Sequence, residues 1–513
     1  MKRGSISKLL VANRGEIALR IIRSARLLGL ATVAVYSEAD ADSVHVAAAD
    51  EARLLGPSEA SQSYLNIAAI IEAARATGAD AIHPGYGFLS ERPEFARAVD
   101  EAGIVFVGPP ADVMAALGDK VAARRLAAGA GVAVVPGLEV VDQRGAQEFA
   151  ARVGFPLIVK AAAGGGGRGM RVVESQERLA EALAAAAREA KAAFGDGRVF
   201  LEKYLAHPRH VEVQVLADWH GGVVALGERD CSIQRRHQKI IEESPAPGLD
   251  DSLRTRMVEA ALKVARVACY RNAGTMEFLV DGGEFYFLEA NTRLQVEHPV
   301  TEMRFGCDLV AEQLRVAMGE HVTEPAAPRG AAIECRIYAE DAEHSFRPAI
   351  GGALYLNLPA GPGVRVDTHL VTGARVTAFY DGLLAKLVCW GADREQARLR
   401  MAAALGEFSL LGVINTAAFL RDVIASEAFR DARLSTRFLE QFFPRWSPGD
   451  DVLESLLVTA AMVAGGALGE AHSLSSGSSW SRGALSDGAR SGRGGRSPWA
   501  ELAGFEPWGR TGR

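Results

Sequence analysis

Residues 1–118 alternate between short apolar runs and helical stretches. The apolar runs that we predict to be strands are Leu9–Ala12, Thr32–Tyr36, Ala81–His83 and Ile104–Val107. Strands that alternate with helices predict a parallel sheet with helices packed on it. The first strand leads into Asn13-Arg14-Gly15-Glu16, which has a single glycine, so the G-x-G-x-x-G fingerprint is missing and a nicotinamide cofactor is disfavoured.

Changes in composition divide the remainder of the chain into three regions. Residues 119–330 contain an apolar strand at 156–160, a glycine run and strands rich in charged residues. Residues 331–447 return to mixed strands and helices, and residues 448–513 form a tail in which Ser, Gly and Arg dominate positions 473–498. Because the tail has few apolar side chains to bury, we expect it to be flexible.

The composition indicates a soluble, cytoplasmic protein with reduced thiols. A formal net charge of −6 on 513 residues gives no reason to expect nucleic acid or a membrane as a partner. The five cysteines are an odd number and include no C-x-x-C pair, which disfavours a disulfide framework or a zinc site. No signal peptide precedes the first strand, and the longest apolar stretch, 455–468, has about 14 residues, too few to span a bilayer.

A glycine run follows the apolar strand at 156–160. Lys160 ends that strand, and Gly164-Gly165-Gly166-Gly167-Arg168-Gly169 comes shortly after it. Glycines let backbone amides approach phosphate oxygens closely, and the lysine and arginine add positive charge. The spacing does not match a P-loop, and a plain surface loop is the simpler alternative. We favour a phosphate-binding loop because a lysine ends the preceding strand.

Two glutamates are predicted to face each other across a hairpin. The segments 274–280 and 284–289 flank a turn at Asp281-Gly282-Gly283, and a hairpin centred on Gly283 sets Glu277 opposite Glu289. Asn291, two residues further on, shares that face. Two carboxylates and an amide oxygen suit a hard cation that also binds nucleotide phosphates, whereas the alternative is an exposed hairpin face. The apolar neighbours of both glutamates favour the metal site.

Two strongly charged strings lie on either side of this hairpin in the sequence. In Asn291–Pro299, Arg293 can clamp an oxyanion and Glu297 can act as a general base, although a solvated loop could have the same composition. The cationic segment Glu228–Lys239 favours a polyanionic substrate or, equally, a charged loop. His210 is most simply a structural histidine on a strand.

Taken in order, these strings resemble the biotin carboxylase component of biotin-dependent carboxylases, an ATP-grasp enzyme. The resemblance covers about residues 6–446 and rests on Val11–Ala18 (VANRGEIA), His83–Glu91 (HPGYGFLSE), Gly118-Asp119-Lys120, the glycine run, Glu228–Lys239, Glu289–Glu302 (EANTRLQVEHPVTE) and Glu334-Cys335-Arg336. It implies a mixed α/β fold with four regions. These are a Rossmann-like N-terminal domain at 1–118, an ATP-grasp domain at 119–330 with a mobile glycine-rich lid at about 135–205, a C-terminal biotin carboxylase domain at 331–447, and a tail at 448–513 that could begin a carboxyltransferase-docking region.

The resemblance also implies roles for individual residues. Those expected around the nucleotide are Lys120, Lys160, Gly165, Gly166, Gly167, Glu202, His210, Gln234, His237 and Leu279. The expected metal ligands are Glu277, Glu289 and Asn291. The expected bicarbonate site comprises Lys239, Arg293, Gln295, Val296 and Glu297, of which Lys239, Arg293 and Glu297 are the catalytic candidates. Tyr86 and Arg336 are expected beside the biotin ring.

The implied activity is the ATP-dependent carboxylation of biotin by bicarbonate, the first half-reaction of an acyl-CoA carboxylase. The expected cofactor is Mg²⁺, with Mn²⁺ as a substitute. The expected partners are a second copy of the chain, a biotin carboxyl carrier and a carboxyltransferase subunit. Biotin is expected on a separate carrier, because no lysine follows Lys386 and the tail therefore has no amine to biotinylate. The final acceptor stays open among acetyl-, propionyl-, methylcrotonyl- and geranyl-CoA and pyruvate.

Three alternatives compete with this interpretation. Another ATP-grasp ligase, such as a carbamoyl phosphate synthetase or a purine-pathway carboxylase, would share the metal hairpin but not the VEHPVTE and QRRHQK strings. A nucleotide-binding scaffold without turnover would not need every catalytic candidate to be present. An RNA-binding role for the tail is weak, because residues 473–498 contain four arginines against one aspartate.

Overall fold

The computed structural model describes residues 5–140, 142–161 and 170–449. The predicted glycine run from Gly164 to Gly169 and almost all of the predicted tail therefore lie outside the described residues. Within the described part, no helix is both long and apolar enough to cross a membrane.

The N-terminal region is the predicted parallel α/β unit. Its five strands have the order β3-β2-β1-β4-β5 and all pair in parallel. The strands are β1 (Lys8–Val11), β2 (Ala31–Ser37), β3 (Glu51–Gly56), β4 (Ala81–His83) and β5 (Val105–Phe106). The helices are α1 (Gly15–Leu27), α2 (Val44–Ala48), α3 (Ile67–Thr77), α4 (Pro93–Glu101) and α5 (Ala111–Gly118), with 3₁₀ turns at Glu38–Asp40 and Ala60–Gln62. Strand β3 was not predicted, because it is an edge strand with no fully buried side chain and lacks a continuous apolar run.

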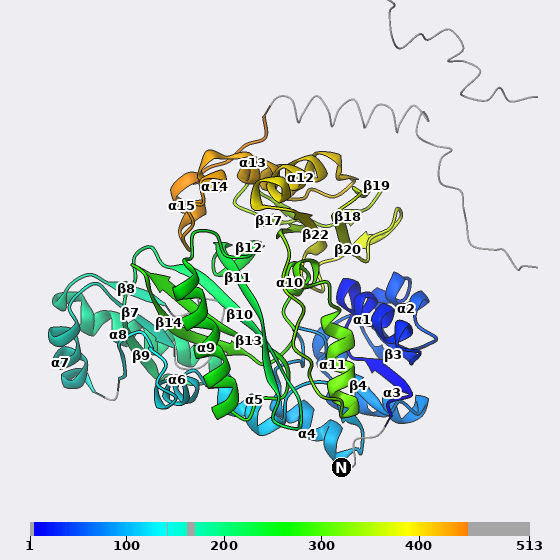
Figure 1. Cartoon of the computed structure of the whole chain (residues 1–513), viewed down its shortest axis with the longest axis horizontal. Helices are drawn as coiled ribbons and strands as arrows, with labels where there is room; N and C mark the ends of the chain where they lie inside the picture. Colours follow the sequence, from blue (N-terminus) through cyan, green and yellow to red (C-terminus); the bar gives the residue numbers. More distant parts are fainter. Residues whose placement is uncertain (1–4, 141, 162–169, 450–513) are drawn as a thin grey trace, which may run out of the picture. The chain divides into compact units, whose positions relative to one another are not determined.

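The middle region contains a small sheet and the first part of a large one (Figure 1). The small sheet has the order β6-β9-β7-β8 and packs against α7 and α8. Its elements are β6 (Gly137–Glu139), α7 (Gln143–Val153), β7 (Leu157–Ala161), β8 (Arg171–Val173), α8 (Gln176–Phe194) and β9 (Val199–Lys203), preceded by α6 (Lys120–Gly129). The large sheet begins with β10 (Arg209–Ala217), β11 (Val223–Arg235), β12 (Gln238–Ser244), β13 (Asn272–Asp281) and β14 (Glu284–Asn291). Helix α9 (Asp251–Val267) covers it, and α10 (His298–Phe305) and α11 (Leu309–Met318) follow.

The large antiparallel sheet continues into the C-terminal region. Its order is β14-β13-β10-β11-β12-β15-β22-β20, so the pairing of β12 with β15 carries one sheet across the predicted boundary at residue 330. The added strands are β15 (Ala331–Tyr338), β20 (Val364–Thr368) and β22 (Leu383–Gly391). This continuity places residues from both regions on one sheet face.

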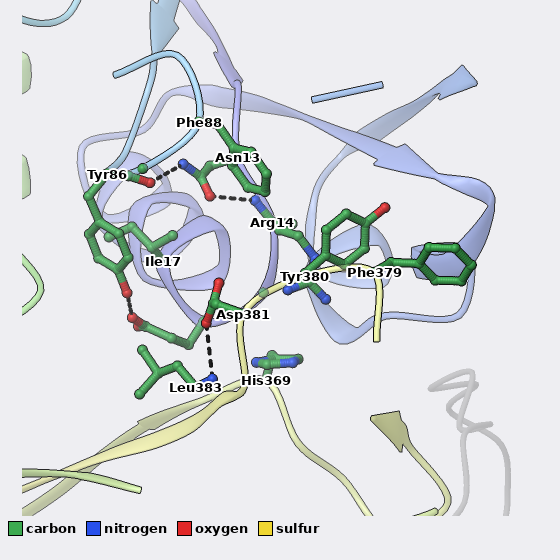
Figure 2. Close-up of a pocket in the computed structure, with 13 residues that line it drawn as sticks. Asn13, Arg14, Ile17, Tyr86, Phe88, His369, Phe379, Tyr380, Asp381 and Leu383 are labelled. Carbon is green, nitrogen blue, oxygen red and sulfur yellow. Dashed lines mark hydrogen bonds between the residues drawn. The ribbon is translucent and has the colours of Figure 1, made fainter. Parts of the chain in front are cut away.

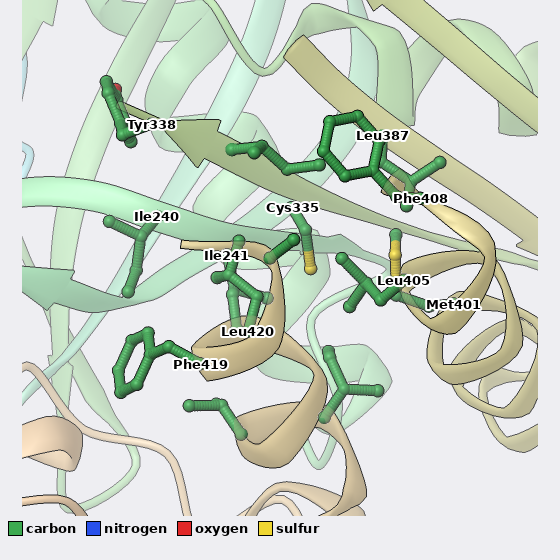
Figure 3. Close-up of a cluster of buried hydrophobic side chains, with 14 of the residues drawn as sticks. Ile240, Ile241, Cys335, Tyr338, Leu387, Met401, Leu405, Phe408, Phe419 and Leu420 are labelled. Carbon is green, nitrogen blue, oxygen red and sulfur yellow. The ribbon is translucent and has the colours of Figure 1, made fainter. Parts of the chain in front are cut away.

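The C-terminal core lies between this sheet and two helices. Figure 3 shows Ile241, Cys335 and Leu387 from the sheet packed against Met401 of α12 (Arg394–Glu407) and Leu420 of α13 (Ala417–Ala425). The remaining elements are β16 (Glu340–Asp341), β17 (Arg347–Pro348), β18 (Gly351–Gly352), β19 (Tyr355–Asn357), β21 (Arg375–Val376), β23 (Ser409–Leu411), α14 (Glu427–Arg430) and α15 (Phe438–Phe442). The core anchors the end of the sheet that carries Arg336.

Candidate functional site

The β13–β14 hairpin sets Glu277 directly opposite Glu289, as predicted. The predicted centre of the hairpin at Gly283 is wrong, because the two-residue turn Gly282-Gly283 pairs Asp281 with Glu284. A β-bulge next to Glu277 then inserts one extra residue into β14 and restores the predicted opposition. The two carboxylates differ in environment, since the side chain of Glu277 is 3% exposed and that of Glu289 is 35% exposed.

Lys239 is the cation around which the buried carboxylates gather. Its ammonium group donates hydrogen bonds to Oε2 of Glu212 at 2.5 Å, Oε1 of Glu277 at 2.8 Å and Oε1 of Glu297 at 2.7 Å. Burial alone would lower the pKa of Lys239, but these carboxylates raise it well above its usual range. Lys239 is therefore charged. Its nitrogen, on a side chain from β12, contacts carboxylates from β10, from β13 and from the segment before α10.

The candidate base Glu297 lies between two cations. Oε1 accepts from Lys239, and Oε2 accepts from Nη2 of Arg336 at 2.9 Å. Burial would raise the pKa of Glu297, but Lys239, Arg336 and the fully buried Arg229 hold it well below its usual range. The carboxylate is consequently ionised at neutral pH, so neither of its oxygens carries a proton.

Arg229 is a functional candidate that the sequence interpretation missed. It is completely buried, and its guanidinium donates to Glu212 at 2.6 Å and to Oε1 of Gln295 at 2.7 Å. It also donates to Gln214 at 2.8 Å and to Thr301 at 3.0 Å. The signal that could have found this network is the alternation along β10, where polar residues at 210, 212 and 214 alternate with valines.

Glu277 has three further donors besides Lys239. Nε2 of His210 lies 2.6 Å from Oε2, and the amide nitrogens of Asn291 and Gln295 donate to Oε1 at 2.6 and 2.7 Å. Burial lowers the pKa of His210, but the carboxylate of Glu277 outweighs burial and raises it. His210 is thus part of the polar cluster, beyond the purely structural role suggested by its strand position.

Arg293 connects the hairpin to the N-terminal region. Its Nη2 donates to Oδ1 of Asn291 at 3.2 Å, and its Nε lies 3.2 Å from Oε2 of Glu91. Glu91 ends the HPGYGFLSE string, so two strings that are far apart in the sequence meet here. The backbone carbonyl of Val296, the residue before Glu297, accepts a hydrogen bond from Nζ of Lys386 at 3.1 Å.

A separate pocket contains the lysines expected at the nucleotide. It is lined by Lys120, Val121, Arg124, Lys160, Ala161, Phe200, Glu202, Leu288 and Glu289. Lys160 donates to Glu202, which also accepts from Arg124 at 2.6 Å, and Lys120 lies 3.4 Å from Glu289. Lys120 is the first residue of α6, whose N-terminus is capped by Asp119. A cation is disfavoured at a helix N-terminus, so this position requires a compensating anion such as Glu289 or a phosphate.

The other residues expected around the nucleotide do not line this pocket among the described residues. Gln234 is buried near the β11–β12 turn, with no partner for Nε2 among the described residues, and Leu279 is half-buried on β13. His237 lies at that turn with φ +66°, and partial desolvation together with the charges of Lys160 and Lys120 lowers its pKa. Gly165, Gly166 and Gly167 lie outside the described residues.

Tyr86 borders a further cavity of about 360 Å³, which the sequence interpretation missed (Figure 2). Its hydroxyl donates to Glu16, which lies 3.2 Å from Nζ of Lys386. On the other side, Arg14 stacks on the ring of Tyr380 at 4.3 Å. The walls are formed by residues 13–17, 86–88, 369, 379–381 and 383, so only the tertiary fold brings them together.

Family models match nearly all of the described chain. Residues 5–114 match a family described as "Biotin carboxylase, N-terminal domain" and residues 334–441 one described as "Biotin carboxylase C-terminal domain". Between them, residues 119–325 match "Carbamoyl-phosphate synthase L chain, ATP binding domain". The two flanking matches separate this chain from the carbamoyl phosphate synthetase alternative.

Curated relatives and solved structures agree with these matches. The biotin carboxylase of Pseudomonas aeruginosa is 49% identical over 446 residues, which are 85% of this chain and 98% of that protein. The biotin carboxylase of Haemophilus influenzae is 50% identical with the same coverage. The structure of a biotin carboxylase–β-γ-ATP complex from Campylobacter jejuni has a TM-score of 0.83 and 45% identity, covering 85% of this chain and 99% of that one. The chain therefore belongs to the biotin carboxylase family.

Proposed function

We propose that the chain uses ATP to activate bicarbonate and transfers the resulting carboxyl group to a ureido nitrogen of biotin. The observation that carries the proposal is the ionised Glu297 held between Lys239 and Arg336, next to the opposed glutamates of the hairpin. A base of this kind suits an anionic acid such as bicarbonate, because the flanking cations attract the anion. A structural relative, the biotin carboxylase domain dimer of Hydrogenobacter thermophilus 2-oxoglutarate carboxylase, was solved with MgADP, ADP and bicarbonate. It is 44% identical with a TM-score of 0.81, covering 85% of this chain and 97% of that one.

ATP would place its phosphates against Lys120 and Lys160. Both ammonium groups lie in the pocket with Glu289, and each is now compensated by a glutamate that a phosphate can replace. We assign Glu277, Glu289 and Asn291 to magnesium, with manganese as a substitute. Their carboxylate and amide oxygens are the ligands that such hard cations prefer, and Glu289 is accessible from the pocket. When bound, the metal would supply positive charge that offsets the charge of the ATP phosphates.

The first chemical step follows from the position of Glu297. The carboxylate takes the proton of bicarbonate, and a bicarbonate oxygen then attacks the γ-phosphorus, which releases ADP and forms carboxyphosphate. Lys239 and Arg293 stabilise the negative charge that accumulates on the reacting oxygens. The amide oxygen of Gln295 accepts a hydrogen bond from Arg229, and its amide nitrogen donates one to Glu277. Gln295 therefore positions both side chains beside this site.

The second step transfers the carboxyl group. Cleavage of the carbon–oxygen bond of carboxyphosphate gives carbon dioxide and phosphate. Phosphate takes the proton from the ureido nitrogen of biotin, which then attacks carbon dioxide. Arg293 stabilises the enolate-like ureido oxygen, and Tyr86 and Arg336 line the place of the ring.

The chain would act with a separate biotin carrier and a carboxyltransferase, as a homodimer in the cytoplasm. One relative is the alpha subunit of a mitochondrial methylcrotonoyl-CoA carboxylase from Glycine max, 48% identical over 86% of this chain and 61% of that protein. Another is a solved biotin carboxylase subunit of pyruvate carboxylase, 44% identical with a TM-score of 0.75, covering 85% of this chain and 98% of that one. Lys386 itself is fully buried and pairs with Glu16, so this lysine is not accessible for biotinylation. The acceptor of the second half-reaction stays open.

The experiment that tests this function measures ADP formation by the purified chain with bicarbonate, biotin or ammonium. Bicarbonate should be required, free biotin should accelerate ADP formation, and ammonium should have no effect. Stimulation by ammonium with a carbamoyl product would favour the carbamoyl phosphate synthetase alternative instead.

A further inference from the structure

Two buried glutamates beside the site have no role in the steps above. Glu242 on β12 lies directly opposite Glu334 on β15, and both side chains are fully buried. Opposed residues on neighbouring strands have Cβ atoms roughly 5 Å apart. Neither carboxylate oxygen of Glu334 has a hydrogen-bond partner among the described residues. Two carboxylates this close in a dry interior cannot both be ionised without a large cost.

Few cations face this pair, and each has another partner. Arg336, two residues from Glu334 on the same face of β15, has its Nη2 2.6 Å from Oε1 of Glu242 and 2.9 Å from Oε2 of Glu297. Lys386 on β22 uses its ammonium group for Glu16 and for a backbone carbonyl. The charged groups around the pair are Lys239 on β12, Arg336 on β15, Lys386 on β22 and Glu297 before α10. Among the described residues, no cation therefore pairs with Glu334 alone.

We propose that Glu242 and Glu334 share one proton and that Glu334 is thereby a positioning residue for Arg336, which rests on the proposed function. A pair with one proton carries one negative charge, so Glu242 holds one side of Arg336 while Glu297 holds the other. Loss of the shared proton adds a second negative charge and draws Arg336 away from Glu297. Gain of a second proton releases Arg336 onto Glu297, which makes that carboxylate a weaker base.

The shifts in pKa agree with this geometry. Burial raises the pKa of Glu242 to about 7 despite the opposing charge of Arg336. Burial also raises the pKa of Glu334 well above its usual range, with Glu242 adding to the shift. The singly protonated pair therefore exists from about pH 7 upward, until Glu334 loses its proton. Turnover should decline on both sides of this range.

The test compares the wild-type chain with Glu334→Gln, which keeps position 334 neutral at every pH. The alkaline decline of kcat for bicarbonate- and biotin-dependent ADP formation should disappear in this variant. The infrared carbonyl absorption of protonated, buried carboxylic acids should also decrease in the resting variant, because Glu334 no longer contributes to it. Glu243→Gln is the matched control, because Glu243 is a buried neighbour on β12 that pairs with Arg394 at 2.6 Å. This control should keep both the alkaline decline and the absorption.

An alkaline decline that persists in Glu334→Gln, or an unaltered carboxylic acid absorption, would overturn the proposal. If Glu334→Gln does not fold, Glu242→Gln provides the second test. Removing that neighbouring negative charge should move the alkaline decline to lower pH, and an unmoved decline would equally contradict the shared proton. The infrared measurement needs no turnover, so it separates failure of this proposal from failure of the proposed function.

Discussion

Nζ of Lys239 lies 2.7 Å from Oε1 of Glu297 and 2.8 Å from Oε1 of Glu277. One ammonium group therefore contacts both the candidate base and a candidate metal ligand. A change of charge at either carboxylate alters the field at the other, because both are buried around the same cation. This arrangement gives the bicarbonate and nucleotide parts of the proposed site a direct electrostatic connection.

Substitution of the candidate base should stop chemistry and spare nucleotide binding. Glu297→Gln keeps the size of the side chain but removes the proton acceptor, so bicarbonate-dependent ADP formation should fall by about 100-fold or more. The affinity for ATP, measured by calorimetry, should stay within about threefold of the wild type. The exposed Glu320→Gln is the control. Normal turnover in Glu297→Gln would remove this residue from the role of base.

The two opposed glutamates should differ in their effects on stability. Glu289 is partly exposed, so Glu289→Gln should lose bicarbonate-dependent ADP formation and keep its urea midpoint. Glu277 accepts hydrogen bonds from Lys239 and His210 in the interior, so Glu277→Gln should lose about 1–3 kcal/mol of unfolding free energy as well. Equal urea midpoints for the two variants would contradict the difference in environment.

Arg229 should be required for folding stability. Arg229→Met leaves the buried carboxylate of Glu212 with Lys239 as its remaining ion-pair partner among the described residues. The free energy of unfolding in urea should fall by about 3–5 kcal/mol, the range expected when one member of a buried pair is removed. Arg97→Met, at an exposed position on α4, is the matched control. A loss below about 1 kcal/mol would show that Arg229 is not stabilising.

His83 should make the chain less stable as the pH falls. Its Nδ1 accepts from the backbone N–H of Gly85 at 3.0 Å, so Nε2 carries the proton and donates to Gln313 at 3.2 Å. Burial lowers the pKa of His83 from 6.5 to about 4. Its contribution to stability is complete above pH 6.5 and is lost as the pH falls toward 4, because the unfolded state binds the proton first.

Urea unfolding at pH 7 and pH 5 measures this effect of His83. The difference in unfolding free energy between the wild type and His83→Gln should shrink by about 2 kcal/mol from pH 7 to pH 5. His207→Gln, at an exposed position, should show no such change. A constant difference between the wild type and His83→Gln would rule out a buried neutral imidazole.

The parts of the fold that follow from local sequence were predictable. Short buried strands such as β1 indicated the parallel sheet, whereas the edge strand β3 carried no apolar run. The opposition of Glu277 and Glu289 was predicted from a hairpin centred on Gly283, whereas in the structure it arises from a different turn together with a β-bulge. The bulge that restores this opposition could not be predicted, since no residue type marks it.

The remaining site residues depend on the order of strands in the large sheet. Glu212, Arg229 and Glu334 lie on β10, β11 and β15, and their partners come from neighbouring strands. Long-range pairing fixes these contacts, so a single strand shows at most an alternation of polar and apolar residues. The segment Asn291–Pro299 predicted Glu297 as a base. The cations that lower its pKa, Lys239, Arg336 and Arg229, lie outside that segment.

Isotope transfer shows whether a bicarbonate oxygen attacks the γ-phosphate of ATP. The chain should be given ATP, magnesium, free biotin and bicarbonate labelled with ¹⁸O in all positions, and the inorganic phosphate analysed by mass spectrometry. Carboxyphosphate retains one bicarbonate oxygen on phosphorus when its carbon–oxygen bond breaks, so each phosphate released should carry one ¹⁸O atom. Phosphate without ¹⁸O, released while biotin is carboxylated, would contradict this account.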